Sequence, residues 1–375
     1  MRSPASLPCG EDADSITDVV VIDPSILERF AVNVLKASGI SDRHASDAAA
    51  HMRWADTHGR PNYGVWRLPI LCRRAEAGLF GDGQDATTTE LGPSLAIVDG
   101  HDAIGHHVGT YATDEAIRRA ADTGLGFVGV KASNFMGAVG YYVERIAGND
   151  MVGLLLTNAS PRVAAHQGTA AVLGTNPIAF GAPVPGSDPI IVDLSTAAGA
   201  GSLITKSIEA GIPLPEGVAI NPDGTPLTDP TRVGKGAMLP LAGPKGFGLA
   251  LMVEILAGVM TGAGMSHGVH SMYKDFDHPA NIGHAVFALR IDAMMPTGVY
   301  RDRIHSLLEI LLDSGDVRLP GANRYDAAKT TMDRGGVELD GPTVEALEKL
   351  AADRDLTPPW DGGQQPWRTD VRELL

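Results

Sequence analysis

The chain has 375 residues, of which 44% are hydrophobic, so it is long enough for one large domain or for two to three smaller ones. Its formal net charge of −15 argues against nucleic acid and anionic membranes as main partners. Only two cysteines, Cys9 and Cys72, are present, which argues against a disulfide framework and against a cysteine-rich zinc site.

The first quarter of the chain is predicted to be helical. Residues 1–20 are polar and acidic, so we expect a disordered start rather than a secretory signal, and hence a cytoplasmic protein. Asp23 and Pro24 then provide a helix cap and a first-turn proline. Helices are expected from Pro24 to near Gly39, from Asp42 to near Gly59 and from Ile70 to Ala77, with Arg67–Pro69 breaking the chain before the third.

From Leu95 onward, short apolar runs alternate with helical stretches. An unbroken apolar run such as residues 152–157 is typical of a buried strand. Strands are expected over residues 95–99, 126–130, 152–157, 178–182, 190–193 and 285–291. Helices are expected over residues 108–123, 301–312 and 344–352, with a further glycine-rich helix start at residues 137–138. No apolar run is long enough and sufficiently free of charge to cross a bilayer, so we expect no membrane partner.

Residues 211–263 contain two unusual stretches. Residues 211–242 are rich in Pro, Gly and Asp and are predicted to form a long irregular surface segment, a kind that is more often functional than idle. In the stretch that follows, Gly246 and Gly248 let the backbone come close to a ligand or another chain, and Lys245 supplies a positive charge. Residues 249–259 are apolar all round the expected helix, which predicts burial in a core or an interface.

The glycines and the lysine before this apolar helix favour an anion, such as a phosphate, bound where the helix begins. The alternative is a loop that enters a core helix and binds no ligand. Common nucleotide-binding and hydrolytic motifs are absent: there is no strand followed by Gly-x-Gly-x-x-Gly, no Walker loop, no His-Glu-x-x-His and no Gly-x-Ser-x-Gly. No pair of histidines has the spacing of a metal site. The residues alone therefore predict a mixed α/β enzyme with an anion site at Lys245.

Eight segments carry a resemblance that goes further. They are residues 55–69, 133–138, 174–179, 193–196, 215–219, 223–230, 244–249 and 319–321. In this order they are similar to the malate/L-lactate dehydrogenase family that includes ureidoglycolate, sulfolactate and 2,3-diketogulonate dehydrogenases and a cyclic-imine reductase, a family distinct from the ordinary lactate dehydrogenases. The resemblance spans roughly residues 24–350, nearly the whole chain.

The resemblance implies a mixed α+β fold with a mostly antiparallel, non-Rossmann cofactor-binding sheet. It implies a helical domain over residues 21–95, joined by part of residues 296–375, that covers the substrate. Residues 96–295 would form the NAD(P)-binding domain. It also implies a homodimer with sites at the interface, which would account for the apolar helix, and hydride transfer between NAD or NADP and a small 2-keto, 2-hydroxy or 2-imino acid.

Site residues are carried over position by position. Arg67 falls on the arginine that binds the substrate carboxylate, a bidentate pairing that suits a guanidinium and that lysine cannot reproduce. Asn62, Phe135 and Gly283 fall on the substrate side, and Asp193 joins Tyr63 and Arg67 in the catalytic group. The positions implied to contact the cofactor are Ser133, Gly137, Ser160, Thr175, Asn176, Pro177, Asp193, Leu194, Ser195, Lys245, Pro320 and Gly321.

The sequence departs from the family where the chemistry should be. The family reads Ser-His-Gly-Val where this chain has Asn62–Val65, and Ser-Asn-His-Phe-Gly where it has Ser133–Gly137, so both histidines are replaced, by Tyr63 and Phe135. Leu71 stands where some members have a tyrosine. A histidine, with a pKa near ~6.5, suits proton exchange with a carbonyl oxygen at neutral pH. A tyrosine, with a pKa near ~10, could donate a proton but would be a poor base.

Two interpretations of Tyr63 remain open. It either replaces the histidine as the acid, with a pKa lowered by Arg67 or another cation, or it only fills the space of the lost imidazole. Phe135 cannot exchange protons and makes the pocket more apolar. Further histidines could compensate, although surface or packing roles are expected for them: His58, His106, His107 and His166.

Three functions follow as hypotheses. The first is an NAD(P)-dependent oxidoreductase with an altered proton donor, for which an imine fits because its nitrogen can arrive already protonated. The second is a non-redox enzyme that carries out elimination, hydration or carbon–carbon bond chemistry beside a carboxylate. The third is a non-catalytic homologue that acts as a partner subunit. Retention of Arg67, Asp193 and Lys245 argues against complete loss of ligand binding.

Overall fold

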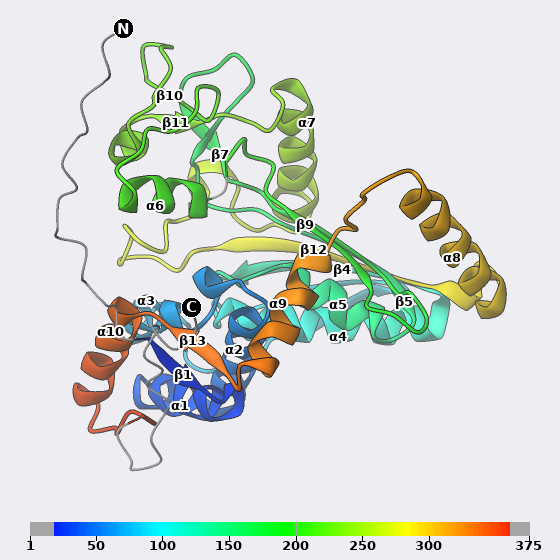
Figure 1. Cartoon of the computed structure of the whole chain (residues 1–375), viewed down its shortest axis with the longest axis horizontal. Coiled ribbons are helices and arrows are strands. Elements are labelled where there is room, and N and C mark those ends of the chain that lie inside the picture. The colour runs from blue at the N-terminus through cyan, green and yellow to red at the C-terminus, as the bar shows by residue number, and fades with distance from the viewer. Residues whose placement is uncertain (1–18, 200, 361–375) are drawn as a thin grey trace, which may run out of the picture.

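The computed structural model describes residues 19–199 and 201–360, and the predicted disordered start therefore lies mostly outside the described residues. Figure 1 shows three layers of structure: a helical body, a long central sheet with helices beneath it, and a smaller β-rich lobe on the opposite side of the sheet. None of the described helices is both long enough and apolar enough to cross a membrane.

The central sheet has seven strands in the order β2-β3-β4-β12-β5-β8-β9. Only β3 and β4 run parallel, and all the other neighbours are antiparallel. This confirms the predicted mostly antiparallel, non-Rossmann sheet. The strand bounds are β2 Thr87–Gly92, β3 Leu95–Asp99, β4 Leu125–Ser133, β5 Met151–Thr157, β8 Ile178–Ala182, β9 Ile190–Leu194 and β12 Ile282–Arg290.

Two helices cover one face of this sheet, α4 (Gly105–Thr123) and α5 (Gly140–Ala147) (Figure 1). Helix α4 can approach β4 closely because Gly126 of β4 has no side chain. A Cβ at this position would lie 2.1 Å from the carbonyl oxygen of Ala116 in α4. A similar constraint holds at Gly283 on β12, where a Cβ would lie 1.7 Å from the carbonyl oxygen of Ala257 on the opposite face. Small residues thus let both layers pack directly on the sheet backbone.

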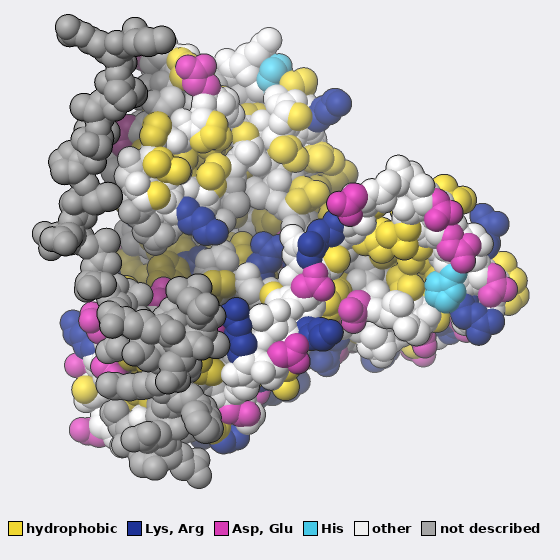
Figure 2. Space-filling model, viewed as in Figure 1, with side chains coloured by type: hydrophobic (Ala, Val, Ile, Leu, Met, Phe, Trp, Pro, Cys, Tyr) yellow, Lys and Arg dark blue, Asp and Glu magenta, His cyan; other side chains and the backbone are white. Residues whose placement is uncertain are grey.

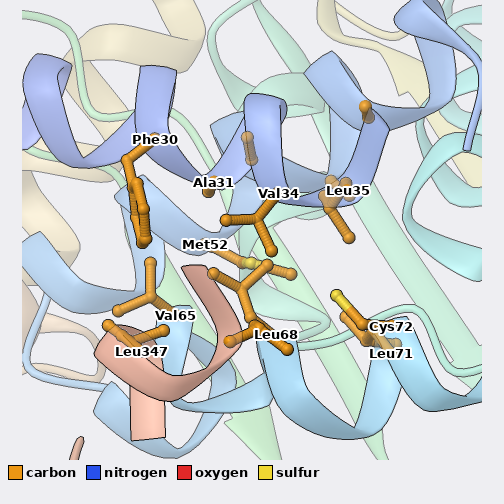
Figure 3. Packing of buried hydrophobic residues seen from close by; sticks show 14 of the residues in the cluster. Phe30, Ala31, Val34, Leu35, Met52, Val65, Leu68, Leu71, Cys72 and Leu347 are labelled. Atoms are coloured by element: carbon orange, nitrogen blue, oxygen red, sulfur yellow. The ribbon is translucent and has the colours of Figure 1, made fainter. Parts of the chain in front are cut away.

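The helical body has its own hydrophobic core, built from α1 (Pro24–Ala37), α2 (Asp42–Thr57), α3 (Leu68–Glu76) and α10 (Gly341–Ala352). Figure 3 shows Met52 and Leu68 packed between Val34 of α1 and Leu347 of α10. The side chain of Asp23 caps α1 by accepting from the N–H of Ser25, as its position before a proline predicts.

Three expectations for this body need correction. Val20 was expected in the disordered start, but it begins β1 (Val20–Ile22), which pairs with β13 (Val337–Leu339). Pro69 does not break the chain, because it lies in the first turn of α3, where a proline costs no helix hydrogen bond. A helix at Ala322–Asp333, α9, was not predicted; its sequence is polar and has no clear apolar stripe.

The β-rich lobe holds a four-stranded sheet in the order β10-β11-β6-β7. Its strands are two or three residues long: β6 Val163–Ala164, β7 Ala171–Leu173, β10 Ala219–Ile220 and β11 Ala237–Met238. Two of them interrupt residues 211–242, which are otherwise mostly irregular as predicted. Helix α6 (Gly201–Glu209) and helix α7 (Pro244–Val253) flank this sheet (Figure 1).

The apolar helix is only half buried in the single chain. Helix α7 continues as a π-helical segment, Glu254–Val259, and one face packs on the central sheet through Val253 and Ala257. The other face is 37–61% exposed and consists of Leu249, Leu251, Met252, Ile255, Val259 and Met260. Figure 2 shows hydrophobic side chains gathered over this helix. The prediction that this helix is buried on all sides within the core of its own chain is therefore wrong. Its burial in an interface remains a prediction.

Helix α8 (Thr297–Asp313) projects from the end of the central sheet (Figure 1). None of its residues is buried. It extends the predicted amphipathic helix by four residues at the N-terminal end.

Candidate active site

Arg67 lies at the centre of the candidate active site, a group of contacting residues that includes Tyr63, Phe135 and Tyr273 and is called the pocket below. It ends the second of two short 3₁₀ turns, Pro61–Tyr63 and Val65–Arg67, that follow α2. Its side chain is only 8% exposed. Its Nε donates to the carbonyl oxygen of Asn62 at 2.7 Å, and its Nη1 donates to the hydroxyl of Tyr273. Within residues 19–199 and 201–360, no carboxylate forms an ion pair with Arg67.

Aromatic rings surround this guanidinium. Its central carbon lies 5.2 Å from the ring centroid of Phe135 and 5.5 Å from that of Tyr273. A buried cation is costly unless an anion or hydrogen-bond acceptors compensate it. The arrangement therefore suits an anionic ligand that completes the pairing of Arg67.

A buried aspartate shapes the turn that presents Arg67. Asp56, near the end of α2, accepts a hydrogen bond from the N–H of Val65 at 2.9 Å. Gly64 passes so close that a Cβ there would lie 1.7 Å from the Asp56 carboxylate. Burial raises the pKa of Asp56 to about 8, and the Val65 hydrogen bond only partly offsets this. The carboxyl group is therefore largely protonated at neutral pH.

Tyr63 stacks on Phe135, with ring centroids 6.2 Å apart and ring planes 14° from parallel. The pKa of Tyr63 is raised, mainly by burial and then by the negative charge of Asp193, and the opposing effect of Arg67 is smaller. The expectation that Arg67 lowers this pKa is therefore wrong in its net direction. Tyr63 keeps its proton at neutral pH, so it can act as a donor and not as a base.

Two fully buried histidines lie behind Phe135. The ring of His106 meets the ring of Phe135 edge-on, with ring centroids 5.8 Å apart. The ring centroids of His51 and His106 are 4.8 Å apart. His51 accepts from the N–H of Ala138 at 2.9 Å, while neither ring nitrogen of His106 has a partner in the described part of the chain. Burial lowers both pKa values, that of His51 to about 4. These histidines are neutral at neutral pH and cannot supply a proton as imidazolium there.

A third buried histidine, His284 on β12, was not considered from the sequence. It joins two strands by hydrogen bonds, to the hydroxyl of Ser133 at 2.8 Å and to the hydroxyl of Thr157 at 2.7 Å. Burial lowers its pKa to about 3. Ser133 thus belongs to an internal polar chain. His284 was hard to single out from the sequence, because it lies within a strand that is otherwise mostly apolar.

On the expected cofactor side, the buried Arg324 forms an ion pair with the partly buried Asp193. Arg324 is 4% exposed, and its Nη2 lies 3.0 Å from Asp193 Oδ2, which also accepts from the N–H of Gly140. Two further donor atoms of Arg324, Nε and Nη1, are buried without an acceptor in the described ranges. Gly140 leaves room for the guanidinium, because a Cβ at this position would lie 2.5 Å from Nη1 and the Arg324 side chain would have to shift. Arg324 was missed because α9, which carries it, was not predicted.

The loop before α9 places two predicted cofactor residues beside this pair. Gly321 has a φ of +96°, a conformation that favours glycine, and Pro320 accepts through its carbonyl oxygen from the N–H of Ile191 on β9. The loop is thereby fixed to the strand that carries Asp193 and Leu194. Gly137 also has a positive φ, +82°, and lies against His51.

Several other predicted cofactor and substrate residues use their polar groups for hydrogen bonds within the fold. Asn176 is fully buried and donates to Glu254, the one charged residue of the apolar stretch, at 2.7 Å. Ser195 donates to the carbonyl oxygen of Thr175 at 3.1 Å. The N–H and carbonyl groups of Gly283 are both hydrogen-bonded to Asn158. Packing accounts for these residues.

The remaining predicted residues differ in exposure. Lys245 is exposed in the first turn of α7 and has no ion pair among the residues that the structure describes. Ser160 and Pro177 are partly buried. Of the histidines considered as substitutes, His58 bonds to the carbonyl oxygen of Trp54 at 2.7 Å, and His166 is exposed.

The comparisons with known proteins agree with this architecture. Residues 22–348 match the model of the malate/L-lactate dehydrogenase family. An L-sulfolactate dehydrogenase of Methanothermobacter thermautotrophicus is 31% identical over 335 residues, covering 89% of this chain and 97% of the relative. A (2R)-3-sulfolactate dehydrogenase (NADP(+)) of Chromohalobacter salexigens is 32% identical, with 87% and 97% coverage.

Among solved structures, a delta1-piperideine-2-carboxylate reductase of Pseudomonas syringae superposes with a TM-score of 0.81 at 27% identity, covering 88% of this chain and 99% of that one. The chain belongs to the malate/L-lactate dehydrogenase family. The predicted resemblance is confirmed.

The raised pKa of Asp56 predicts how stability depends on pH. An unfolded aspartate loses its proton near pH 3.8 and the folded one near pH 8, so in this window the folded state binds more protons. The free energy of unfolding should therefore fall as pH rises from about 4 to about 8. Asp56→Asn keeps a neutral acceptor for Val65 and removes the titration, so its stability relative to the parent should increase with pH.

Urea unfolding of both proteins at the two ends of this window measures the effect. Asp82→Asn, an exposed change on the surface, serves as the control. If the parent and Asp56→Asn lose the same free energy of unfolding between the two pH values, Asp56 is ionised in the folded protein.

Proposed function

We propose that this chain is an NAD(P)-dependent oxidoreductase that transfers hydride to or from a small 2-keto, 2-hydroxy or cyclic 2-imino acid. The observation that carries the proposal is the buried guanidinium of Arg67, which has no carboxylate partner in the part of the chain that the structure describes. A substrate carboxylate supplies that partner through a charge-assisted, bidentate pair. The family relatives that act on sulfolactate and piperideine-2-carboxylate support this choice.

The cofactor side of the proposal rests on Arg324. Two of its donors are buried without an acceptor in the described ranges, which suits an anionic group of a dinucleotide. Arg324, the Pro320–Gly321 loop and the exposed Lys245 would hold the cofactor, which, when bound, supplies or accepts the hydride. Whether it is NAD or NADP depends on which anionic groups these residues accept.

The chain's own residues would handle the charge and the proton. Arg67 binds the carboxylate and orients the atom that is reduced. Tyr63 keeps its proton at neutral pH and would donate it to the oxyanion that develops on a keto acid, whereas a protonated imine takes up hydride to give a neutral amine without a further acid. Phe135 offers no polar group, so the pocket favours a substrate whose nitrogen is already protonated. A cyclic imino acid fits this requirement best.

The replaced histidines favour one second candidate, a non-redox reaction beside a carboxylate. Such an enzyme would use Arg67 in the same way but would consume its substrate without changing the cofactor. The buried donors of Arg324 that find no acceptor among the described residues favour the oxidoreductase, because a site that had lost its cofactor would gain nothing by keeping them.

A homodimer completes the proposal. The exposed face of α7 and its π-helical continuation forms a contiguous apolar strip, which is typical of a protein interface. In sedimentation velocity the full chain should have the mass of a dimer. Leu251→Glu places a charge on this strip and should shift the equilibrium to monomer, whereas the exposed β2 change Leu91→Glu should not. A monomeric parent protein would contradict the proposal.

Substitution of the carboxylate-binding residue tests the substrate class. Arg67→Lys keeps the charge but loses the planar fork, so kcat/KM for a 2-keto or 2-imino acid should fall ~10- to 100-fold, mostly through KM. The matched control is Arg73→Lys on α3, an exposed arginine that stacks on Phe276. Equal kinetics for Arg67→Lys and the parent would remove Arg67 from the substrate site.

Tyr63→Phe tests the proton donor. With a 2-keto acid as substrate, loss of the hydroxyl should lower kcat by ~100-fold or more while leaving cofactor affinity unchanged, because general acid catalysis contributes ~100- to 10,000-fold. Tyr300→Phe on α8, which removes a hydroxyl bonded to the Pro183 carbonyl, controls for loss of a tyrosine hydroxyl as such. Turnover near that of the parent would mean that Tyr63 only fills space.

Arg324→Gln tests the cofactor site. In a fluorescence titration the affinity for NADH or NADPH should fall ~10- to 100-fold, since a hydrogen bond to a charged group contributes ~1.5–3 kcal/mol. Arg318→Gln, an exposed arginine paired with Asp326, is the control. Unchanged affinity in Arg324→Gln would place the cofactor elsewhere.

A further inference from the structure

A second group of buried histidines lies outside the pocket. His44 projects from α2, His107 from α4 and Asp85 from the loop between α3 and β2, and their ligand atoms all lie within 4.8 Å of one another. The side chains of both histidines are nearly fully buried, and that of His107 is only 1% exposed. The side chain of Asp85 is half exposed. The two imidazoles stack with centroids 4.0 Å apart.

The distances match those around a small tetrahedral cation. Nε2 of His44 lies 3.1 Å and Nε2 of His107 lies 3.7 Å from Oδ1 of Asp85. Two ligands that each bind zinc at ~2.0–2.1 Å in tetrahedral geometry are ~3.3 Å apart. For these two pairs of atoms a cation would require shifts of only a few tenths of an ångström, and the ligand atoms of the two imidazoles lie within 4.8 Å of each other.

The hydrogen bonds around His107 leave the right atom available. Its Nδ1 lies 2.7 Å from the carboxylate of Asp47, which fixes the proton on Nδ1 in the neutral ring. The other nitrogen, Nε2, then carries a lone pair, is buried, and has no hydrogen-bond partner within the described residues. Such a carboxylate–histidine pair behind the ligand is common at zinc sites.

Asp85 is held in a matching orientation. Its second oxygen, Oδ2, forms an ion pair with Arg43 at 3.0 Å, so that Oδ1 faces the two histidines. Without a cation, the lone pair on Nε2 of His107 would face a carboxylate oxygen, a repulsive arrangement that a positive charge removes. The exposed side of Asp85 leaves room for a water molecule as a fourth ligand.

We propose that His44, His107 and Asp85 bind a divalent transition-metal ion of the zinc class. Two imidazoles and a carboxylate are ligands that Zn²⁺ accepts. Spacing along the chain gave no sign of this site, because its ligands come from three separate segments. The site is independent of the proposed hydride transfer, since none of its ligands lies in the Arg67 pocket.

The metal would have a structural effect on that pocket. It ties the Asp85 loop to α2 and to the first turn of α4. That turn also carries His106, which packs against Phe135. Metal binding therefore fixes the wall of apolar side chains behind the pocket.

A second cluster provides the control. His270, Asp275 and His278 also have ligand atoms close together, but Asp275 already accepts from the N–H groups of Asp277 and His278, and its histidines are partly or fully exposed. Unlike His107, the described histidines of this cluster have no ring nitrogen that is both buried and without a hydrogen-bond partner. We therefore expect it to bind metal far more weakly.

The test is titration of the full, untagged chain with Zn²⁺ or Co²⁺ after removal of metals with a chelator. The parent should bind one equivalent, with the visible absorption of tetrahedral Co²⁺ and a raised Tm. Asp85→Ala and His44→Gln should weaken binding by at least ~10-fold. His278→Ala should bind like the parent. Circular dichroism checks that each variant is folded, and Asp85→Ala, a half-exposed change, keeps the test valid if His44→Gln does not fold.

Two results would overturn the proposal. One is the absence of stoichiometric binding by the parent at micromolar metal. The other is parent-like binding by Asp85→Ala together with loss of binding in His278→Ala, which would assign the metal to the exposed cluster.

Discussion

The site depends most on the positive charge of Arg67, which is buried without a counter-ion among the residues that the structure describes. The guanidinium of Arg67 is surrounded by aromatic rings and is held by a backbone carbonyl and the Tyr273 hydroxyl. Placing a cation there costs desolvation energy that these neutral contacts recover only in part. A turn fixed by Asp56 and Gly64 keeps it in place. In the function that we propose, the substrate is the anion that completes the pairing, so that binding and orientation would result from one interaction.

Burial also sets the protonation states around this charge. Asp56 and Tyr63 keep their protons, while His51, His106 and His284 lose theirs, each because the charged form is the one that burial penalises. The pocket therefore contains neutral donors around Arg67. None of these groups is a strong acid at neutral pH, so the proposed function places first a substrate that brings its own proton, such as a cyclic iminium.

The fold was largely predictable, because the central strands are apolar runs and because the family resemblance spans nearly the whole chain. The misses have physical reasons. Strands β1 and β13 are three residues long and gain their stability from each other across more than 300 positions of sequence. Helix α9 lacks an apolar stripe, so nothing in its local pattern indicated that it carries Arg324. Exposure of one face of α7 could not be foreseen, since an apolar sequence does not distinguish a core from an interface.

The site was predictable only in part. Resemblance pointed to Arg67 and Asp193, and in the structure Arg67 is buried and Asp193 is partly buried beside Arg324. It could not show that burial outweighs Arg67 in setting the pKa of Tyr63, because a pKa depends on all surrounding atoms. Nor could it show that Asn176 and Ser195 use their side chains to hold the fold. His44, Asp85 and His107 come from segments whose proximity exists only in three dimensions.

The most direct test of this account is to mix the purified chain with NADH or NADPH and a panel of 2-keto and cyclic 2-imino acids. The nicotinamide absorbance and the amount of substrate would be followed together. We predict that one cofactor molecule is oxidised for each carboxylate substrate reduced, with a cyclic imino acid turned over fastest. Consumption of substrate without any change in the nicotinamide absorbance would contradict the account and assign Arg67 to non-redox chemistry.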